Sequence, residues 1–189
     1  MAAAYKNSPK WVKRMEELFG QSDFNKDGYL SIQDFDMWSD NLEKEVKAEP
    51  ALLKKVRKTT QDFWETVGLK QGVLLSREKF VENMAEVAVT EKASFDEGKE
   101  SSLFFIMMET VFDAIDTNRD GYLQMSEYAA MNKASNFDDG TAKILFDIID
   151  KNHDGKLSRK ELMEYNIKFW FTPDDPEAAG LFGAKFEQN

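Results

Sequence analysis

Hydrophobic residues recur every three or four positions along most of the chain, and this spacing predicts amphipathic helices. The first stripe consists of Trp11, Met15, Leu18 and Phe19. Ser8 and Pro9 stand just before it, and these residue types are typical of the cap and the first position of a helix. The pattern therefore predicts a helix that begins near Ser8 and runs into the polar residues at Asp23.

Apolar stripes of the same kind flank four polar stretches, so the chain repeats a unit of helix, loop and helix. The later stripes are formed by Phe35, Trp38, Leu42 and Val46; by Leu52, Val56, Phe63 and Val67; by Phe80, Met84 and Val87; by Phe104, Met108, Val111, Phe112 and Ile115; by Tyr128 and Met131; by Ile144, Leu145, Ile148 and Ile149; and by Leu162, Tyr165, Phe169 and Trp170. We predict an all-α fold of about eight helices, with the four units in two pairs packed into one compact globule.

The apolar pattern weakens at residues 93–98, where polar residues and a glycine replace it. We place the domain boundary there. The N-terminal pair then occupies residues 1–94, and the C-terminal pair with a tail occupies residues 95–189.

Three of the four polar stretches share one pattern of oxygen-bearing residues. A twelve-residue loop binds Ca²⁺ through oxygens at positions 1, 3, 5, 7, 9 and 12, with a backbone carbonyl at position 7 and glycine at position 6. The candidate ligands are Asp23, Asn25, Asp27, Tyr29, Ser31 and Asp34 in the first loop, Asp116, Asn118, Asp120, Tyr122, Gln124 and Glu127 in the third, and Asp150, Asn152, Asp154, Lys156, Ser158 and Glu161 in the fourth. An acidic surface turn would explain one such stretch, but three between helices predict three Ca²⁺ sites.

The first loop closes on an aspartate instead of a glutamate. The side chain of Asp34 is one methylene shorter, so we expect it to bind through one oxygen and to leave a six-oxygen shell. Because Mg²⁺ prefers a small octahedral shell, we expect Mg²⁺ to compete with Ca²⁺ most strongly at this loop.

The second polar stretch, near residues 67–79, lacks the ligands. Aligning it on Gly72 puts apolar residues and Gln71 at positions 1, 3 and 5, and aligning Leu75 with Leu30 puts Lys79 at position 12. Neither alignment gives a cation site. Leucines also stand at position 8 of the three good loops, at Leu30, Leu123 and Leu157. We expect these leucines to lie in short backbone pairings between loops, with the second unit as the structural partner of the first.

Composition and charge limit the kinds of partner. Hydrophobic residues make up 42% of the 189 residues, which is enough to bury a sizeable core. A formal net charge of −10 argues against nucleic acid and anionic membranes as partners and favours cations. No apolar run approaches the roughly 20 residues of a membrane span, and no secretory signal is recognisable. We expect a soluble, cytoplasmic monomer without an evident protein target.

An enzymatic function is not expected. The chain has no cysteine, and its single histidine, His153, lies at position 4 of the fourth loop, where side chains face solvent. A calcium sensor, which would open a methionine-rich groove for a target, is a stronger alternative. The methionines are scattered, however, and the aromatic stripes are typical of core packing. We also expect the tail, with Leu181, Phe182 and Phe186, to cover the helices.

With three good loops and a silent second loop, the chain resembles the invertebrate sarcoplasmic calcium-binding proteins, a four-EF-hand family. The resemblance covers nearly the whole chain, including the sequence WVKRM at residues 11–15 and LFG at residues 181–183. It implies two packed EF-hand pairs, metal binding at the first, third and fourth loops, and a role as a cytosolic Ca²⁺ and Mg²⁺ buffer.

The chain is also similar to the related coelenterazine-binding photoproteins and luciferin-binding proteins. The sequence NIKFWFT at residues 166–172 looks like the photoprotein sequence HLGFWYT. Asn166 stands in place of the catalytic histidine, Phe182 in place of the tyrosine that stabilises the bound peroxide, and Asn189 in place of the terminal proline. The resemblance therefore implies no peroxide storage and no light emission, and binding of a luciferin in the core remains an alternative to the buffer.

Overall fold

The computed structural model describes residues 2–174. Within them, the N-terminal half contains α1 (Ala2–Lys6), α2 (Pro9–Ser22), α3 (Ile32–Glu45), α4 (Pro50–Val67) and α5 (Arg77–Asp96). The C-terminal half contains α6 (Leu103–Ile115), β1 (Tyr122–Gln124), α7 (Met125–Ala134), α8 (Asp139–Ile149), β2 (Lys156–Ser158) and α9 (Arg159–Phe171). The predicted all-α fold of four helix-loop-helix units is confirmed, and α1 is an additional helix that the apolar pattern did not predict. The expectations for Leu181, Phe182, Phe186 and Asn189 fall outside the described residues.

Side-chain caps explain where several of the helices begin. The Oγ of Ser8 accepts a hydrogen bond from the N–H of Trp11 (3.2 Å), as predicted for the start of α2. Ser158 and Glu161 form a reciprocal capping box at the start of α9. Such caps satisfy backbone N–H groups that the first helical turn leaves without partners. Ser158 and Glu161 are also candidate metal ligands, so the fourth loop leads directly into its outgoing helix α9.

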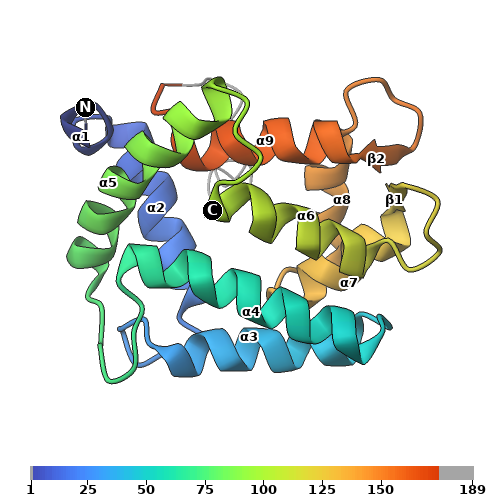
Figure 1. Cartoon of the computed structure of the whole chain (residues 1–189), viewed down its shortest axis with the longest axis horizontal. Helices are drawn as coiled ribbons and strands as arrows, with labels where there is room; N and C mark the ends of the chain where they lie inside the picture. The colour runs from blue at the N-terminus through green and yellow to red at the C-terminus, as the bar shows by residue number, and fades with distance from the viewer. Residues whose placement is uncertain (1, 175–189) are drawn as a thin grey trace.

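The predicted pairing between loops is confirmed in both halves. β1 and β2 are antiparallel, and Leu123 lies opposite Leu157. In the first half, Leu30 and Leu75 exchange two backbone hydrogen bonds of 3.0 and 2.9 Å. All four leucines are buried. Figure 1 shows the two loop pairs at opposite ends of the long axis of the molecule.

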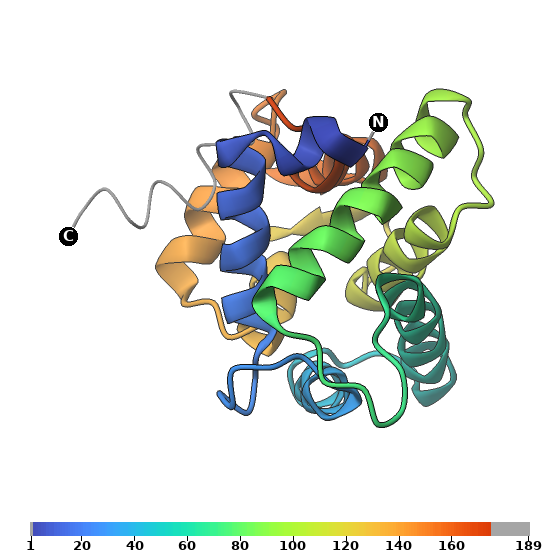
Figure 2. The ribbon, with the colours of Figure 1, turned by 90° about the vertical axis from the view of Figure 1, so that its left-hand side faces the viewer.

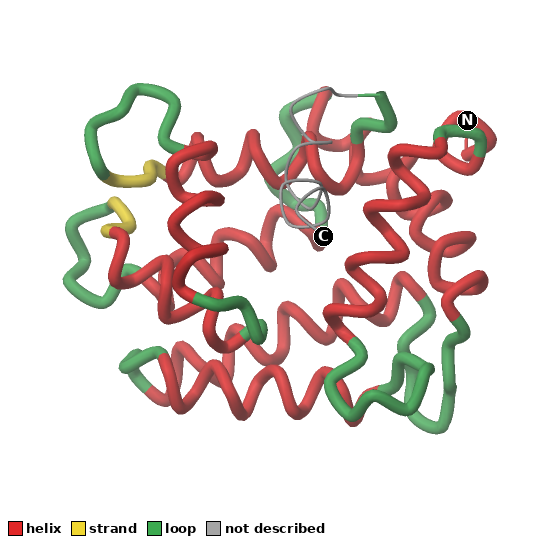
Figure 3. The backbone as a smooth tube through the Cα atoms, turned by 180° about the vertical axis from the view of Figure 1, so that it is seen from behind, coloured by secondary structure: helices red, strands yellow, loops and turns green. Residues whose placement is uncertain are grey.

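The two halves pack against each other through α4 with α6 and α3 with α7 (Figures 1 and 3). The predicted boundary at residues 93–98 falls largely within the last turn of α5, and the connection to α6 occupies residues 97–102. Helix propensity in this polar stretch therefore extends α5 further than the apolar pattern indicated. The division at residue 94 stays a prediction.

The N-terminal helices hold the end of α9 (Figure 2). The Tyr5 hydroxyl donates to the carbonyl of Phe171 (2.9 Å), and Nε1 of Trp11 donates to the carbonyl of Trp170 (2.8 Å). Both donors belong to buried aromatic residues, and a buried donor without a partner would be costly. These bonds connect the two ends of the described chain and fix Trp170 in the centre of the molecule.

Candidate metal loops and central cavity

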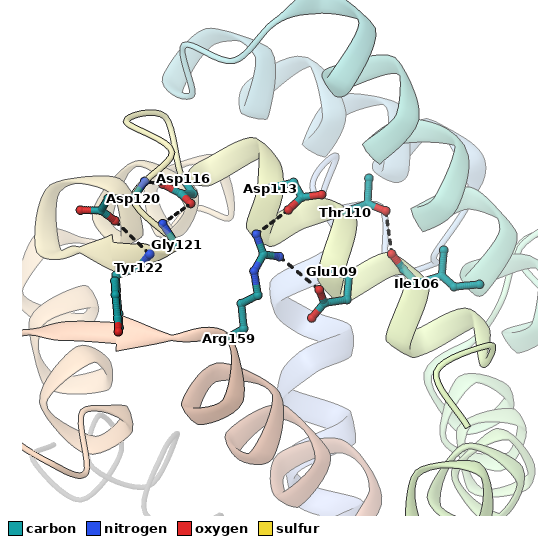
Figure 4. Close-up of polar contacts among 9 residues, drawn as sticks. All are labelled: Ile106, Glu109, Thr110, Asp113, Asp116, Asp120, Gly121, Tyr122 and Arg159. Carbon is teal, nitrogen blue, oxygen red and sulfur yellow. Dashed lines mark hydrogen bonds and ion pairs between the residues drawn. The ribbon is translucent and has the colours of Figure 1, made fainter. Parts of the chain in front are cut away.

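The third loop has its two end carboxylates fixed by backbone N–H groups. Oδ1 of Asp116 accepts from the N–H of Asp120 (3.1 Å), and Oδ2 accepts from the N–H of Gly121 (2.9 Å), as Figure 4 shows. At the other end, Oε1 of Glu127 accepts from the N–H groups of Thr117 (2.9 Å) and Asn118 (3.3 Å). Both carboxylates are more than nine-tenths buried. The loop thus holds positions 1 and 12 in place.

The fourth loop repeats this arrangement. Asp150 accepts from the N–H groups of Asp154 (3.2 Å) and Gly155 (2.9 Å), and Glu161 accepts from the N–H of Ser158 (2.9 Å). Burial opposes the charge on Glu161, but hydrogen bonds from the side chain and backbone of Ser158 and from two further backbone N–H groups lower its pKa below the ordinary value. Glu161 is therefore ionised near neutral pH and can bind a cation.

All three loops share one backbone conformation. Gly28, Gly121 and Gly155 at position 6 have φ of 87°, 83° and 80°, a region that favours glycine. Lys26, Arg119 and His153 at position 4 also have positive φ, near 60°. Such φ values are uncommon for residues other than glycine, so their repetition shows that the three turns have the same geometry. His153 is exposed, as expected from its position in the loop.

The first loop differs at its closing residue. Asp34 accepts from the backbone N–H and the hydroxyl of Ser31 (2.9 and 3.0 Å). Toward the front of the loop it reaches only the N–H of Asn25, at 3.2 Å. The corresponding Glu127 reaches two N–H groups in the third loop. The shorter side chain therefore bridges the two ends of the loop more weakly, as its length predicts.

The remaining candidate ligands bond to one another. In the third loop, Nδ2 of Asn118 donates to Oε1 of Gln124, and Nε2 of Gln124 donates to Oδ2 of Asp120, both at 2.7 Å. Across residues 2–174, no three Asp, Glu, His or Cys side chains converge closely enough to hold a metal ion by themselves. The candidate donor atoms are nevertheless all oxygens, from carboxylate, amide and hydroxyl side chains and from one backbone carbonyl in each loop, and this donor set fits a hard cation such as Ca²⁺ or Mg²⁺.

The second loop aligns on its leucine. Leu75 lies opposite Leu30, so Gly68 occupies position 1 and Lys79 occupies position 12. Nζ of Lys79 turns away to Oε2 of Glu82 (2.7 Å). Gly68, with φ of 101°, ends α4, and Nδ2 of Asn83 donates to the carbonyl of Val67 (2.7 Å). The structure thus selects the alignment with a lysine at position 12, which supports the interpretation of this loop as a structural partner.

A cavity of about 240 Å³ lies between the four units. Its walls include aromatic and polar residues from both halves, among them Trp38, Thr60, Trp64, Tyr128, Tyr165 and Trp170. The Oγ1 of Thr60 is buried and has no hydrogen-bond partner among the described residues. The resemblance to luciferin-binding proteins left a ligand in the core as an alternative, but the apolar pattern alone did not identify this cavity, because residues that line it recur at the same helical spacing as core residues. No sequence signal separates the two.

Polar groups in the cavity wall are neutral. Burial raises the pKa of Tyr128, an effect that a hydrogen bond with Asn132 partly offsets, and burial together with the nearby Tyr128 raises the pKa of Tyr165. Asn166 also lines the wall, and its Nδ2 donates to the carbonyl of Leu162 (2.8 Å). The cavity therefore offers hydroxyl and amide groups on an aromatic surface.

Comparison with known proteins places the chain among calcium-binding relatives. A family model for an EF-hand domain pair matches residues 105–166. Clytin of Clytia gregaria is 28% identical over 180 residues, which cover 94% of this chain and 90% of clytin. The luciferin-binding protein of Renilla reniformis is 27% identical over 176 residues, covering 90% of this chain and 91% of that protein. The crystal structure of photoprotein clytin matches with a TM-score of 0.82 and covers 94% of each chain.

The resemblance to sarcoplasmic calcium-binding proteins is supported in part. Such a protein from Hediste diversicolor is 30% identical over 126 residues, which cover 64% of this chain and 67% of that protein. Photoproteins and the luciferin-binding protein match over nearly the full length, so the similarity to them is broader than the sequence patterns indicated. No helix within residues 2–174 is both long and apolar enough to cross a lipid bilayer.

Proposed function

The chain belongs to the EF-hand calcium-binding family related to the coelenterazine-binding photoproteins, and we propose that it binds three Ca²⁺ ions and encloses a coelenterazine-type luciferin. Calcium binding would use the first, third and fourth loops, whose carboxylates and amide oxygens supply the donors that Ca²⁺ prefers. The luciferin would occupy the central cavity. Similarity to the luciferin-binding protein of Renilla reniformis over 90% of this chain supports this ligand class.

The observation that carries the luciferin proposal is the unpartnered hydroxyl of Thr60 in an aromatic wall. A buried polar group without a partner costs roughly 1 to 3 kcal/mol, so its retention is best explained by a ligand that bonds to it. The rings of Trp64 and Trp170 lie 5.7 Å apart in the same wall and offer faces to an aromatic ligand. The cavity of about 240 Å³ is slightly smaller than the usual 300 to 1000 Å³, so binding requires small side-chain movements.

We propose no photoprotein chemistry for this cavity. Asn166 has no proton that titrates near neutral pH, so it cannot act as the acid or base that a histidine in its place would provide. Its amide nitrogen is also committed to the carbonyl of Leu162. The bound luciferin would therefore be stored and released unchanged.

The test is a titration of the protein with coelenterazine, followed by quenching of tryptophan fluorescence. We expect saturable quenching, because three tryptophans line the cavity. Thr60→Val should weaken binding about fivefold, the equivalent of one hydrogen bond of about 1 kcal/mol. Thr59→Val is the matched control, because the hydroxyl of Thr59 already donates to the carbonyl of Lys55 (3.1 Å) and does not line the cavity. Absence of saturable quenching at micromolar coelenterazine would contradict the proposal.

A Ca²⁺ and Mg²⁺ buffer is the second candidate, favoured by the loop that closes on Asp34. The weaker closure of this loop suits the small shell of Mg²⁺, and buffers keep such mixed sites. Three bound ions with strong competition by Mg²⁺ and no luciferin binding would favour the buffer over the first proposal.

A further inference from the structure

Arg159 connects the start of α9 to the helix that precedes the third loop. Its Nη1 lies 3.1 Å from Oε2 of Glu109, and its Nη2 lies 2.6 Å from Oδ1 of Asp113. The guanidinium carbon also lies 4.1 Å from the centre of the Phe112 ring. Figure 4 shows Arg159 reaching from the end of β2 to two turns of α6. We call this group of four residues the Arg159 clamp.

The clamp is connected to a candidate ligand of each of the two metal loops, by chain on one side and by a hydrogen bond on the other. On the α9 side, Arg159 directly follows Ser158 at position 9 and precedes Glu161 at position 12 by two residues. On the α6 side, the carbonyl of Phe112 accepts the N–H of Asp116, which is position 1 of the third loop, at 2.9 Å. These contacts connect the first turn of α9 to the residue that opens the third loop.

The N-terminal half contains the corresponding arginine without the ion pairs. Arg77 begins α5 as Arg159 begins α9, and its guanidinium lies over Phe19, whose carbonyl accepts the N–H of Asp23. The distance is longer, 5.6 Å, and Gly20 stands where α6 carries Asp113. No ion pair between Arg77 and α2 is found among the described residues. The full clamp thus occurs in the C-terminal half, which has two ligand-bearing loops. The N-terminal half, which has one such loop, has only the contact of Arg77 with the Phe19 ring.

The clamp is better suited to positioning than to stability. The side chains of Arg159, Glu109 and Asp113 are 37%, 34% and 40% exposed, and ion pairs at such sites contribute little to folding. A planar guanidinium that binds two carboxylates and a ring nevertheless has one preferred orientation, which a lysine cannot reproduce. The clamp therefore fixes the angle between α6 and α9.

We propose that the Arg159 clamp couples the third and fourth loops, so that an ion bound at one raises the affinity of the other. This inference rests on the proposed binding of Ca²⁺ at these two loops. Glu161 would hold the ion of the fourth loop, and a shift of Glu161 on binding would reach Asp116 through the first turn of α9, the clamp and the end of α6. The paired strands β1 and β2 alone would give weaker coupling, because they join the loops only at positions 7 to 9.

The test follows each loop separately by two-dimensional NMR of backbone amides. The N–H of Gly121 donates to Asp116 and the N–H of Gly155 donates to Asp150, so each glycine signal reports the ion in its own loop. Ca²⁺ is titrated into four proteins: wild type, Glu161→Gln, Arg159→Lys, and the double variant. Arg159→Lys keeps the positive charge but removes the planar guanidinium that binds both carboxylates, so a change in net charge cannot explain its effect.

We expect Glu161→Gln to weaken binding at Gly121 about 10-fold when Arg159 is present and about 3-fold or less in the Arg159→Lys background, within the usual range of coupling between sites. Arg77→Lys is the matched control and should leave the Gly121 response unchanged. An equal effect of Glu161→Gln in both backgrounds would overturn the coupling role while leaving Ca²⁺ binding intact. A wild-type protein whose Gly121 and Gly155 signals do not respond to Ca²⁺ would instead overturn the proposed function and this inference together.

Discussion

Lengthening the closing residue of the first loop should change its preference between Ca²⁺ and Mg²⁺. In Asp34→Glu, the added methylene would let the carboxylate reach a second N–H group at the front of the loop, as Glu127 does. It would also let both carboxylate oxygens face the ion. A larger shell with a second carboxylate oxygen favours Ca²⁺, whereas Mg²⁺ keeps a small octahedral shell.

The structure has room for this change. A cavity of about 50 Å³ lies beside Asp34, bordered by Ser31, Trp38 and Leu69, and a methylene group fits into it. The overpacking cost of about 1 to 3 kcal/mol that is usual in a filled core should therefore be small here. The second carboxylate oxygen would join the Ca²⁺ shell but not the octahedral Mg²⁺ shell, and a differential contact of about 1.4 kcal/mol would raise the ratio of Ca²⁺ to Mg²⁺ affinity about 10-fold.

The assay is a Ca²⁺ titration of this loop, with and without millimolar Mg²⁺, followed through the amide of Gly28. That amide donates to Oδ2 of Asp23 (3.1 Å) and so reports the first loop. Asp36→Glu is the matched control, because it adds a methylene at an exposed acid on the same helix. An unchanged affinity ratio in Asp34→Glu would refute the argument from side-chain length.

Two further predictions concern stability. Leu157→Ala removes a fully buried side chain from the strand pairing and should lower the free energy of unfolding by about 2 to 5 kcal/mol, measured by urea denaturation; a loss below about 1 kcal/mol would contradict the packing. Burial raises the pKa of the Glu91 carboxyl, and hydrogen bonds with Ser102 and Phe104 only partly offset this effect. The folded state therefore favours the protonated carboxyl. The contribution of Glu91 to the free energy of unfolding is fully present below the unfolded pKa of about 4.3 and is lost as the pH rises through the higher folded pKa. Glu91→Gln should therefore shift the Tm of the metal-free protein more favourably at pH 7 than at pH 4, and equal shifts at the two pH values would exclude this cause.

Local patterns were sufficient to predict most of the fold. Helical spacing and capping residues such as Ser8 placed the helices, and the leucines at position 8 predicted the loop pairing. The loop motif also predicted the shared backbone geometry, because glycine at position 6 and the carboxylates at the ends act within twelve residues. The helix starts and the loop geometry depend on neighbours in sequence, and the loop pairing could be predicted because a leucine recurs at position 8 of the ligand-bearing loops.

Features that depend on distant segments could not be predicted in this way. The cavity forms where side chains from both halves meet, and Thr60 differs from other helical threonines only in its surroundings. The Arg159 clamp joins residues that are far apart in sequence, and Arg159 by itself resembles any charged residue at the start of a helix. The register of the second loop likewise required the observed pairing of Leu30 with Leu75.

We expect Ca²⁺ to bind in the first, third and fourth loops and not in the second loop. The most direct measurement is a single Ca²⁺ titration followed by the backbone amides of Gly28, Gly121 and Gly155, with Gly72 of the second loop as the internal reference. Each of the first three amides donates to the carboxylate at position 1 of its loop, whereas position 1 of the second loop is Gly68. We predict that the first three signals shift and saturate while Gly72 shows no saturable binding of its own. A saturable site at Gly72, or fewer than three responding glycines among the others, would contradict this assignment of the Ca²⁺ sites.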